Sequence, residues 1–466
     1  MVRFAYVTFC QLQRQFQEDS RLSHSARYSA VFAASLLCAG VACADPVEVL
    51  VWHTLNPHNA AEFQKLAQQF NKEQGDVKVV LRGFPNQAAM LSPASRQEAE
   101  KRKPDLVQLD DRHSPEVTAQ NKEIVPLYQL LKQYPISDLG WYLPQTTGFV
   151  RDSKNQLLAF PFMAEIPVMF YNLDAYRKAG LNPAQPAATW TDLQGHLIAL
   201  RDKADIDCPY ATSEEVLVHL ESLAPINNSL YATPNNGLDN AKGLELNFDT
   251  VYMRHMAIMV SWKKSLLFTT YSNGNEPDKL FADGKCAVLT AGSGSLGQFQ
   301  DAKGLKTGVA PIPYHPLATS KPGTPFVTGS ALWATSGQPK EQNKATMGFL
   351  AFLSKPVLAA QWHQHTGYLP LTDAAFRSAD VAFYDSAPGA RQIVEMMKRN
   401  PEKNQRGFRL PNYSKIEPIL TREFDASMAD QTPPILALNN AMDQAQPLLR
   451  QGETPAKPAP AVRKKK

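Results

Sequence analysis

The chain has 466 residues, of which 44% are hydrophobic and 20% are charged. That length is two to three times the usual size of one domain, so two lobes with separate cores are expected. Residues 1–44 and 452–466 together hold nine of the 48 Lys and Arg residues but only three of the 44 Asp and Glu residues. The rest of the chain is close to neutral, which gives no support to nucleic-acid binding, and the composition excludes a disordered or collagenous protein.

An export signal is predicted over residues 1–44. Two arginines precede an apolar run that ends in small residues at Ala44, a pattern typical of signal cleavage. The mature chain is then expected to begin at Asp45 and to reside in the periplasm, because no later stretch approaches the ~20 apolar residues that span a bilayer. A lipid anchor on Cys43 is the alternative, but Gly40 stands where a lipobox normally has leucine.

The first predicted elements alternate between the strand period and the helix period. Strands are predicted over residues 47–54, 77–84 and 105–111, and helices over 60–74 and 86–103. This order predicts a β-α-β-α-β lobe with a parallel sheet.

The middle of the chain continues with two extended pieces and then a helix from about Leu173. A second helix over residues 190–204 is predicted with Thr191 as its N-cap. Further elements are predicted as strands at 208–212 and 330–337, a strand followed by a Gly/Ser loop and a helix start at 285–300, and two helices over 340–367 separated by Pro356. The C-terminal third reads as helical, and residues 452–466 form a proline-rich basic tail that is expected to be disordered.

Four segments in this order resemble one known family: VWHT, PVMFYNLDAYRKAGLNPAQPAATWTDL, FADGKCAVLTAGSGSL and WHQHTGYLPLT. They resemble the extracellular solute-binding proteins of ABC importers, and within these the glycerol-3-phosphate-binding subgroup. The resemblance covers about residues 47–449. It implies an α/β, two-lobe periplasmic binding protein fold of type II, with a ligand cleft between the lobes. It assigns residues 45–163 and 325–370 to lobe 1, and residues 164–324 and 371–451 to lobe 2.

The same resemblance implies a non-catalytic protein without a cofactor, whose partners are a small phosphate ligand and the inner-membrane permease subunits. The implied ligand contacts are Tyr368, Arg409, Ser293, Ser295, Gly329 and Asp111. The fork of a guanidinium group fits two anionic oxygens at once, and a tyrosine hydroxyl can donate to a phosphate or polyol oxygen. The loop around Gly292 and Gly294 lets the backbone approach a ligand and opens a helix, whose N–H groups favour an anion.

Several positions depart from the family pattern. Phe84 and Pro85 stand where the family has a tyrosine, and the family's acidic residue falls on Asp111, next to Asp110. Ala164 and Glu165 replace a serine stretch, and tryptophans of the pocket wall fall near Glu214 and Leu217. An added buried carboxylate disfavours a phosphate dianion. These changes favour a larger glycerophosphodiester with a cationic head, such as glycerophosphocholine, over sn-glycerol 3-phosphate. Its phosphate would contact Arg409, and its ammonium group would contact Glu165 or Glu214.

Other interpretations stay open beside this one. An oligosaccharide ligand would keep the fold, an exported phosphodiester hydrolase would need metals or an activated nucleophile, and a scaffold would need no ligand. A metal site at His363 and His365 is disfavoured because two residues apart on a helix is about 200° around its axis. Ser293 does not meet the GxSxG pattern. In an oxidising compartment, Cys208 and Cys286 form either one disulfide or two buried thiols.

Overall fold

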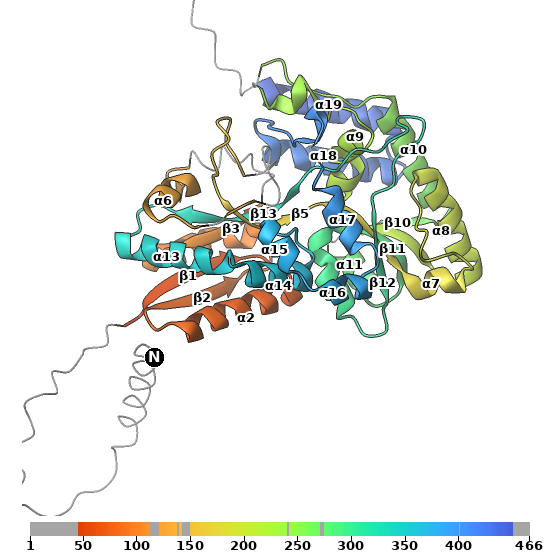
Figure 1. Ribbon diagram of the computed structural model, residues 1–466. Coiled ribbons are helices and arrows are strands. Elements are labelled where there is room, and N and C mark those ends of the chain that lie inside the picture. Colours follow the sequence, from red (N-terminus) through yellow and green to blue (C-terminus); the bar gives the residue numbers. More distant parts are fainter. Residues whose placement is uncertain are drawn as a thin grey trace, which may run out of the picture.

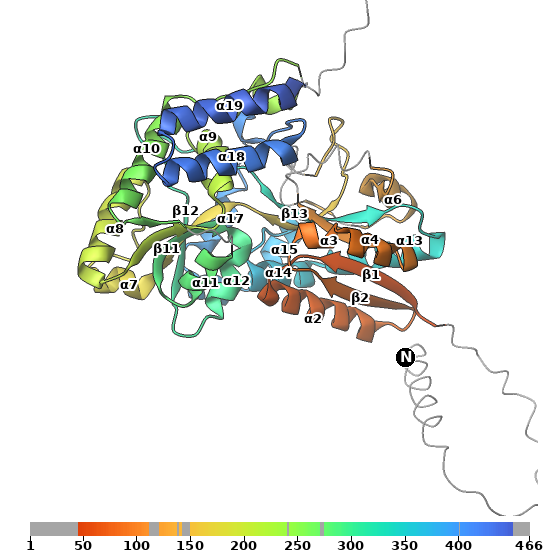
Figure 2. The ribbon, with the colours of Figure 1, turned by 180° about the vertical axis from the view of Figure 1, so that it is seen from behind.

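The computed structural model describes residues 45–110, 121–137, 139–141, 150–239, 242–270, 275–399 and 401–450. Two β-sheets lie side by side in this part of the chain, each flanked by helices (Figures 1 and 2). The predicted export signal, the predicted basic tail and Asp111 lie outside the described residues. The α/β class with two lobes is confirmed, and the exact lobe boundaries stay a prediction.

The first sheet has the strand order β2-β1-β3-β13-β4, with β5 paired to β13. Strand β1 is parallel to β2 and β3, whereas β13 is antiparallel to β3, β4 and β5. Its strands are β1 (Val47–His53), β2 (Val77–Gly83), β3 (Leu106–Asp110), β4 (Ile124–Val125), β5 (Phe160–Glu165) and β13 (Thr328–Thr335). Its helices are α2 (Pro57–Glu73), α3 (Gln87–Met90), α4 (Pro93–Lys101), α6 (Leu127–Gln133), α13 (Lys340–Leu353) and α14 (Pro356–Thr366).

The predicted β-α-β-α-β order is confirmed, but the single helix over residues 86–103 is wrong. Two helices, α3 and α4, stand there. Ser92 caps the second helix by accepting a hydrogen bond from the Ser95 amide, and Pro93 follows at the first helical position. Serine at the N-cap and proline at N1 are both helix-start signals, so they divide the segment.

The second sheet has the strand order β10-β7-β11-β6-β12. Its strands are β6 (Pro167–Asn172), β7 (Cys208–Thr212), β10 (Phe268–Thr269), β11 (Cys286–Gly292) and β12 (Thr307–Pro311), and a separate pair joins β8 (Ala232–Thr233) to β9 (Glu245–Leu246). Helices of this half are α7 (Leu173–Lys178), α8 (Trp190–Ala204), α9 (Leu223–Ile226), α10 (Thr250–Lys264), α11 (Glu276–Ala282), α12 (Leu296–Gln300), α18 (Tyr413–Met428) and α19 (Pro434–Arg450), together with a π-helix at Leu217–Glu221. Three short helices follow α14 in the chain, α15 (Asp373–Ser378), α16 (Val381–Ser386) and α17 (Ala390–Met396); α15 packs on α14, and α17 packs on β12.

Helix α8 begins where the sequence predicts a helix, but its predicted N-cap is wrong. The hydroxyl of Thr189, not Thr191, accepts the hydrogen bond from the Asp192 amide, at 3.1 Å. Trp190 fills the first helical position and is fully buried. Burial of this indole against the core fixes the helix start at Trp190, so the N-cap is Thr189, two residues before the predicted cap.

The chain passes from one sheet to the other at Ile166, which is the single residue between β5 and β6. Residues far apart in sequence are also joined within the second sheet, where Cys208 of β7 and Cys286 of β11 form a disulfide. This settles the alternative left open by the sequence, because the two cysteines lie opposite each other in register on parallel neighbouring strands.

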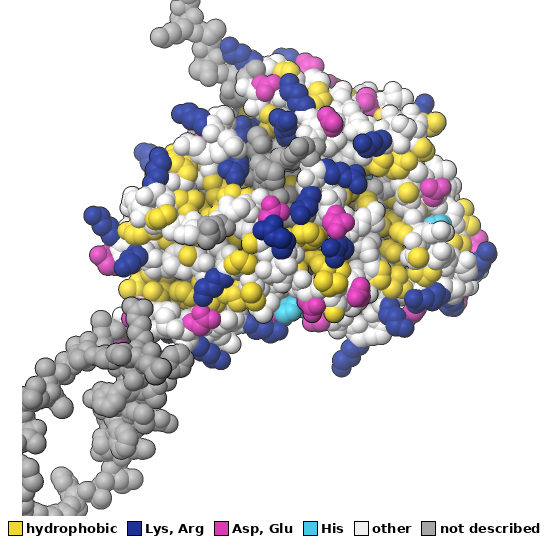
Figure 3. Space-filling view, viewed as in Figure 1, with side chains coloured by type: hydrophobic (Ala, Val, Ile, Leu, Met, Phe, Trp, Pro, Cys, Tyr) yellow, Lys and Arg dark blue, Asp and Glu magenta, His cyan; other side chains and the backbone are white. Residues whose placement is uncertain are grey.

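Charged side chains of both signs are interspersed over the face shown in Figure 3, with exposed apolar side chains between them. This mixed surface agrees with the near-neutral charge of the body. Within the described ranges, every helix is too short or too polar to cross a bilayer.

Candidate functional site

A large cleft of about 1290 Å³ lies between the two halves of the molecule. One wall comes from the start of α2 and from Glu165 and Tyr368, which belong to segments of the first half. The opposite wall comes from residues 213–217, 275–283 and 294–303 and from two residues of α18, Glu417 and Thr421. A cleft of this size between two sheets suits a small solute.

Tyr368 enters the cleft from a turn that ends helix α14. Gly367 adopts a left-handed conformation with φ of 92°, and its amide donates to the His363 carbonyl at 2.8 Å, so the helix stops there. Two residues further on, the Leu369 amide donates to the Ala164 carbonyl at 2.7 Å and connects the turn to β5. The turn thereby presents Tyr368 to the cleft, and its contact with a ligand stays a prediction.

The Tyr368 ring stacks on Trp362, with ring centroids 5.6 Å apart, and only 8% of the residue is exposed. Burial raises the pKa of its hydroxyl, and the nearby charges of Glu165 and Glu214 raise it further, while a hydrogen bond with Asn59 lowers it. The hydroxyl is therefore protonated at neutral pH and can donate a hydrogen bond to a ligand oxygen.

Glu165 stands at the end of β5, where it reaches the loop that follows β11. Its Oε2 accepts a hydrogen bond from the Gly294 amide at 2.8 Å. Gly329, on the neighbouring strand β13, has φ of 99°, and a Cβ placed there would lie 2.3 Å from the Met163 carbonyl oxygen. Gly329 therefore serves the close pairing of β13 with β5 beside Glu165, and it is not among the described residues that line the cleft.

The two serines of the Gly/Ser loop have different surroundings. Ser295 lines the cleft, and its hydroxyl donates to Asp278 Oδ2 at 3.0 Å, as does Gln298 Nε2 at 2.9 Å. Ser293 is 5% exposed and does not line the cleft, and its amide donates to the Ile166 carbonyl at 2.8 Å. Burial raises the pKa of Asp278, while hydrogen bonds from Ser213, Ser295 and Gln298 oppose that shift.

The opposite wall of the cleft is acidic. Residues 213–216 follow β7 and lead into the π-helix, whose Val218 amide donates to the Glu214 carbonyl at 2.9 Å and so fixes the turn. The acidic residues along the cleft outnumber the lysines seven to two among the described lining residues, namely Glu165, Glu214, Glu215, Asp278, Asp283, Asp301 and Glu417 against Lys279 and Lys303. Such a field favours a ligand with a cationic group and disfavours a dianion.

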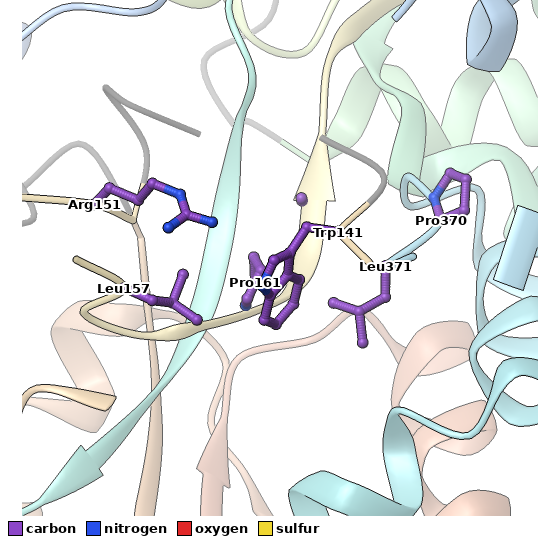
Figure 4. Close-up of a pocket in the computed structure, with 7 residues that line it drawn as sticks. Trp141, Arg151, Leu157, Pro161, Pro370 and Leu371 are labelled. Carbon is purple, nitrogen blue, oxygen red and sulfur yellow. The ribbon is translucent and has the colours of Figure 1, made fainter. Parts of the chain in front are cut away.

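Arg409, the residue expected to hold a phosphate, is 7% exposed and is not among the described residues that line the cleft. Its Nη2 donates to the Arg151 carbonyl at 3.0 Å, and its own amide donates to the Asn236 carbonyl at 2.8 Å. Arg151 borders a second cavity, shown in Figure 4, which also contacts Trp141 and Pro370. That cavity measures about 10 Å³, which is room for roughly one water molecule.

The structure thus brings four of the predicted site residues together in the cleft: Tyr368, Glu165, Glu214 and Ser295. It also adds residues that the sequence analysis missed: Asn56, His58, Glu215, Asp278 and Glu417. Glu215 could have been noticed beside Glu214, but the other residues carry no local signal because they come from separate helices and loops.

The two histidines of the WHQHT segment have unrelated roles. His363 is 3% exposed, and its ring nitrogens lie 2.6 Å from the Tyr368 carbonyl oxygen and 2.8 Å from the Tyr384 hydroxyl. His365 is exposed, with Nδ1 3.0 Å from Glu62 Oε2. One histidine is therefore packed and the other faces solvent. His363 braces the turn that carries Tyr368.

Comparison with known proteins agrees with this architecture. Residues 65–390 match the family of bacterial extracellular solute-binding proteins. The chain is 32% identical to the sn-glycerol-3-phosphate-binding periplasmic protein UgpB of Pectobacterium atrosepticum, over 95% of this chain and 100% of that protein. It is also 32% identical to the protein of the same name from Escherichia coli K12, over 91% of this chain and 99% of that protein.

Two solved structures share the fold at low sequence identity. UgpB from Mycobacterium tuberculosis, in complex with glycerophosphocholine, superposes with a TM-score of 0.69 at 18% identity, covering 88% of this chain and 99% of that one. Maltose-bound MalE3 from T. maritima superposes with a TM-score of 0.70 at 17% identity, covering 86% and 100%. The chain belongs to the bacterial extracellular solute-binding protein family. It is a non-catalytic protein of the periplasm or cell exterior that binds a small solute for an ABC transporter.

Proposed function

We propose that this protein captures a glycerophosphate compound and delivers it to the permease of an ABC importer. A glycerophosphodiester with a cationic head, such as glycerophosphocholine, is favoured over sn-glycerol 3-phosphate. The observation that carries this choice is the excess of carboxylates along the cleft, where seven acidic residues face two lysines in the described lining. A zwitterionic diester has one phosphate charge and one ammonium charge, so it suits this field better than a phosphate dianion.

The relatives support the ligand class. Proteins 32% identical over nearly the whole chain are named for binding sn-glycerol 3-phosphate, and the M. tuberculosis protein of the same fold was solved with glycerophosphocholine. In the proposed complex, Glu165 and Glu214 face the ammonium group and Tyr368 donates to an oxygen of the ligand. Arg409 is not among the described residues that line the cleft of this structure, and we propose that it reaches the phosphate when the lobes close on the ligand, because its guanidinium group suits a phosphate by charge and shape. Asp111 is proposed to accept hydrogen bonds from the glycerol hydroxyls, and Ser293, Ser295 and Gly329 to shape the loop and strand around the ligand.

An oligosaccharide is the second candidate because structures of sugar-binding proteins, including maltose-bound MalE3, share the fold. Sugars are usually bound by stacking on aromatic rings. Tyr368 is the one Phe, Tyr or Trp residue in the described lining of the cleft. This argues for the glycerophosphate ligand.

Calorimetric titration of residues 45–466 with glycerophosphocholine, sn-glycerol 3-phosphate and maltose tests the proposal. We expect micromolar binding of glycerophosphocholine, about 8 kcal/mol of binding free energy, and weaker binding of sn-glycerol 3-phosphate. Arg409→Ala should lower the affinity for the phosphate ligands at least about tenfold, since a charge-assisted hydrogen bond contributes about 1.5–3 kcal/mol.

The matched control is Arg391→Ala, because Arg391 is half exposed and pairs with Glu395 on helix α17. This variant should bind as the wild type does. If the protein binds maltose alone, or if Arg409→Ala leaves the affinity for glycerophosphocholine unchanged, the proposed phosphate site is contradicted. An oligosaccharide is then the remaining candidate ligand.

A further inference from the structure

The backbone N–H and the backbone carbonyl of Gly294 are both bonded to side chains of the first half of the molecule. Its N–H donates to Glu165 Oε2 at 2.8 Å, and its carbonyl oxygen accepts from Asn59 Nδ2 at 2.9 Å. Asn59 belongs to α2 and is fully buried, and Glu165 ends β5, whereas Gly294 follows β11 of the second sheet. The loop that was expected to offer its backbone to an anionic ligand therefore binds an anion of the protein itself.

The space around this carboxylate is fitted to it. A Cβ on Gly292 would lie 2.3 Å from Glu165 Oε2, and a Cβ on Gly294 would lie 2.8 Å from the same atom and 2.4 Å from Tyr368 Cε1. At distances below 3.0 Å one of the atoms must shift, so a side chain at either position would displace the Glu165 carboxylate or the Tyr368 ring from its present place. The two glycines bring the backbone close to Glu165.

We propose that Glu165 is a specificity-determining residue, which occupies the Gly294 N–H donor with the protein's own carboxylate and so denies it to an anionic group of a ligand. Hydrogen bonds from backbone N–H groups to a carboxylate are charge-assisted and roughly twice as strong as neutral ones. An incoming phosphate monoester must displace that carboxylate or lie beside it, and like charges repel strongly where water is excluded. A cationic or hydroxyl-bearing group is attracted to the same carboxylate.

This inference rests on the proposed function and gives it a mechanism of selection. Glu165→Ala removes both the charge and the occupant of the N–H group, while Glu165→Gln removes the charge and keeps a carbonyl acceptor of the same size. We expect Glu165→Ala to raise the affinity for sn-glycerol 3-phosphate about tenfold and to lower that for glycerophosphocholine about tenfold. Glu165→Gln should lower the affinity for glycerophosphocholine and raise that for sn-glycerol 3-phosphate less than Glu165→Ala does.

Glu214→Gln is the matched control because Glu214 lines the same cleft, whereas the Gly294 amide donates to Glu165. It removes one carboxylate from the cleft, so it should lower the affinity for glycerophosphocholine. It should raise the affinity for sn-glycerol 3-phosphate less than Glu165→Ala does. If Glu165→Ala leaves the ratio of the two affinities unchanged, or shifts it no more than Glu214→Gln does, Glu165 does not determine specificity.

A ligand-free measurement separates this inference from the proposed function. In protein labelled with ¹⁵N-glycine, the Gly294 amide proton should move upfield in Glu165→Ala and stay in place in Glu214→Gln. Inorganic phosphate should then perturb the Gly294 amide in Glu165→Ala but not in the wild type. If these shifts occur although neither glycerophosphate compound binds the wild type, the proposed function fails and the role of Glu165 stands. If glycerophosphocholine binds and the shifts are absent, the function stands and the role of Glu165 is refuted.

Discussion

The cores of both halves pack aromatic rings, and the second half adds a connected chain of buried polar side chains. Helices α2, α13 and α14 cover the first sheet with aromatic rings. The ring centroid of Phe63 lies 6.1 Å from that of Phe349 and 5.8 Å from that of Trp362. Trp362 also stacks on Phe162 of β5, with centroids 4.5 Å apart. The helices of the second sheet also pack aromatic rings, such as Trp190 and Trp262 with centroids 6.0 Å apart, and in addition enclose polar side chains that bond to one another.

The main polar feature of the second half is a chain of buried histidines. His219 of the π-helix lies 2.8 Å from His255 of α10, and His255 lies 3.1 Å from His315. The Tyr210 hydroxyl lies 3.1 Å from His219 and 2.7 Å from Thr290. If each neutral ring donates one N–H toward His315 and Tyr210 donates to His219, every contact in the chain has one donor and one acceptor.

A second buried contact fixes the other end of the π-helix. Glu221 is 3% exposed, and its Oε1 accepts a hydrogen bond from the Tyr413 hydroxyl at 2.5 Å. Tyr413 in turn lies 2.9 Å from the Tyr231 hydroxyl. The π-helix directly follows the acidic wall of the cleft, so the second half holds its ligand-facing wall by side-chain hydrogen bonds. The first half holds Tyr368 by ring packing on Trp362 together with the hydrogen bonds of its turn.

The largest effect is expected from removing a ring in the first half. Trp362→Ala should lower the free energy of unfolding by about 4 kcal/mol, because it leaves a cavity and leaves the Phe162 carbonyl without its bond from the indole Nε1, at 2.7 Å. The loss should be the same at pH 7.5 and pH 5.5, since none of the lost contacts titrates. Urea unfolding at the two pH values measures it.

Val357→Ala, a change on the same helix at a residue 61% exposed, is the control and should cost less than about 0.5 kcal/mol. A loss below 1 kcal/mol for Trp362→Ala would mean that ring packing does not hold this half together, and the comparison between the two cores would fail.

The next effect concerns the covalent link in the second half. The bond between Cys208 and Cys286 closes a loop across a sequence separation of 78 residues. Replacing both cysteines by alanine should lower the free energy of unfolding by about 2–4 kcal/mol, chiefly because the unfolded chain gains freedom. Dithiothreitol should destabilise the wild type by a similar amount and leave the double variant unchanged. Equal effects of dithiothreitol on both proteins would show that the disulfide is not the source of the stability.

The elements that the sequence predicted correctly depend on local patterns. Alternating apolar residues gave the strands, and helical spacing with Pro356 between the two segments gave α13 and α14. The turn at Gly367 and the presentation of Tyr368 also follow from residues adjacent in sequence. The misplaced cap at Thr191 shows the limit of this approach, since burial of Trp190 decided where the helix starts.

The acidic wall and the histidine chain could not be predicted because their members are distant in sequence. His219, His255 and His315 are separated by 36 and 60 residues and have no shared spacing. Glu417 reaches the cleft from a helix some 200 residues after Glu214. Glu165 was noticed as a departure from the family, but its bond to Gly294 depends on how the two sheets meet at Ile166.

The smallest effect is the response of the histidine chain to acid. Burial lowers the pKa of His219 to about 3. It lowers the pKa of His315 to about 4, and the charge of Arg254 adds to that shift. The pKa of His255 is lowered by burial and, to a smaller extent, by the charges of His219 and His315. Unfolded histidine has a pKa near 6.5, so below that value the unfolded chain binds more protons than the folded one. The stability that these neutral rings contribute is therefore complete above pH 6.5 and is lost as the pH falls toward 3.

Replacing His219 by glutamine should make the fall in stability between pH 7.5 and pH 5 shallower by about 2 kcal/mol, because one proton fewer is taken up on unfolding. His365→Gln is the control, since the His365 ring is exposed and lies in the first half. Urea unfolding followed at each pH gives the slopes. If the slope for His219→Gln equals that of the wild type, the acid response does not arise in the histidine chain.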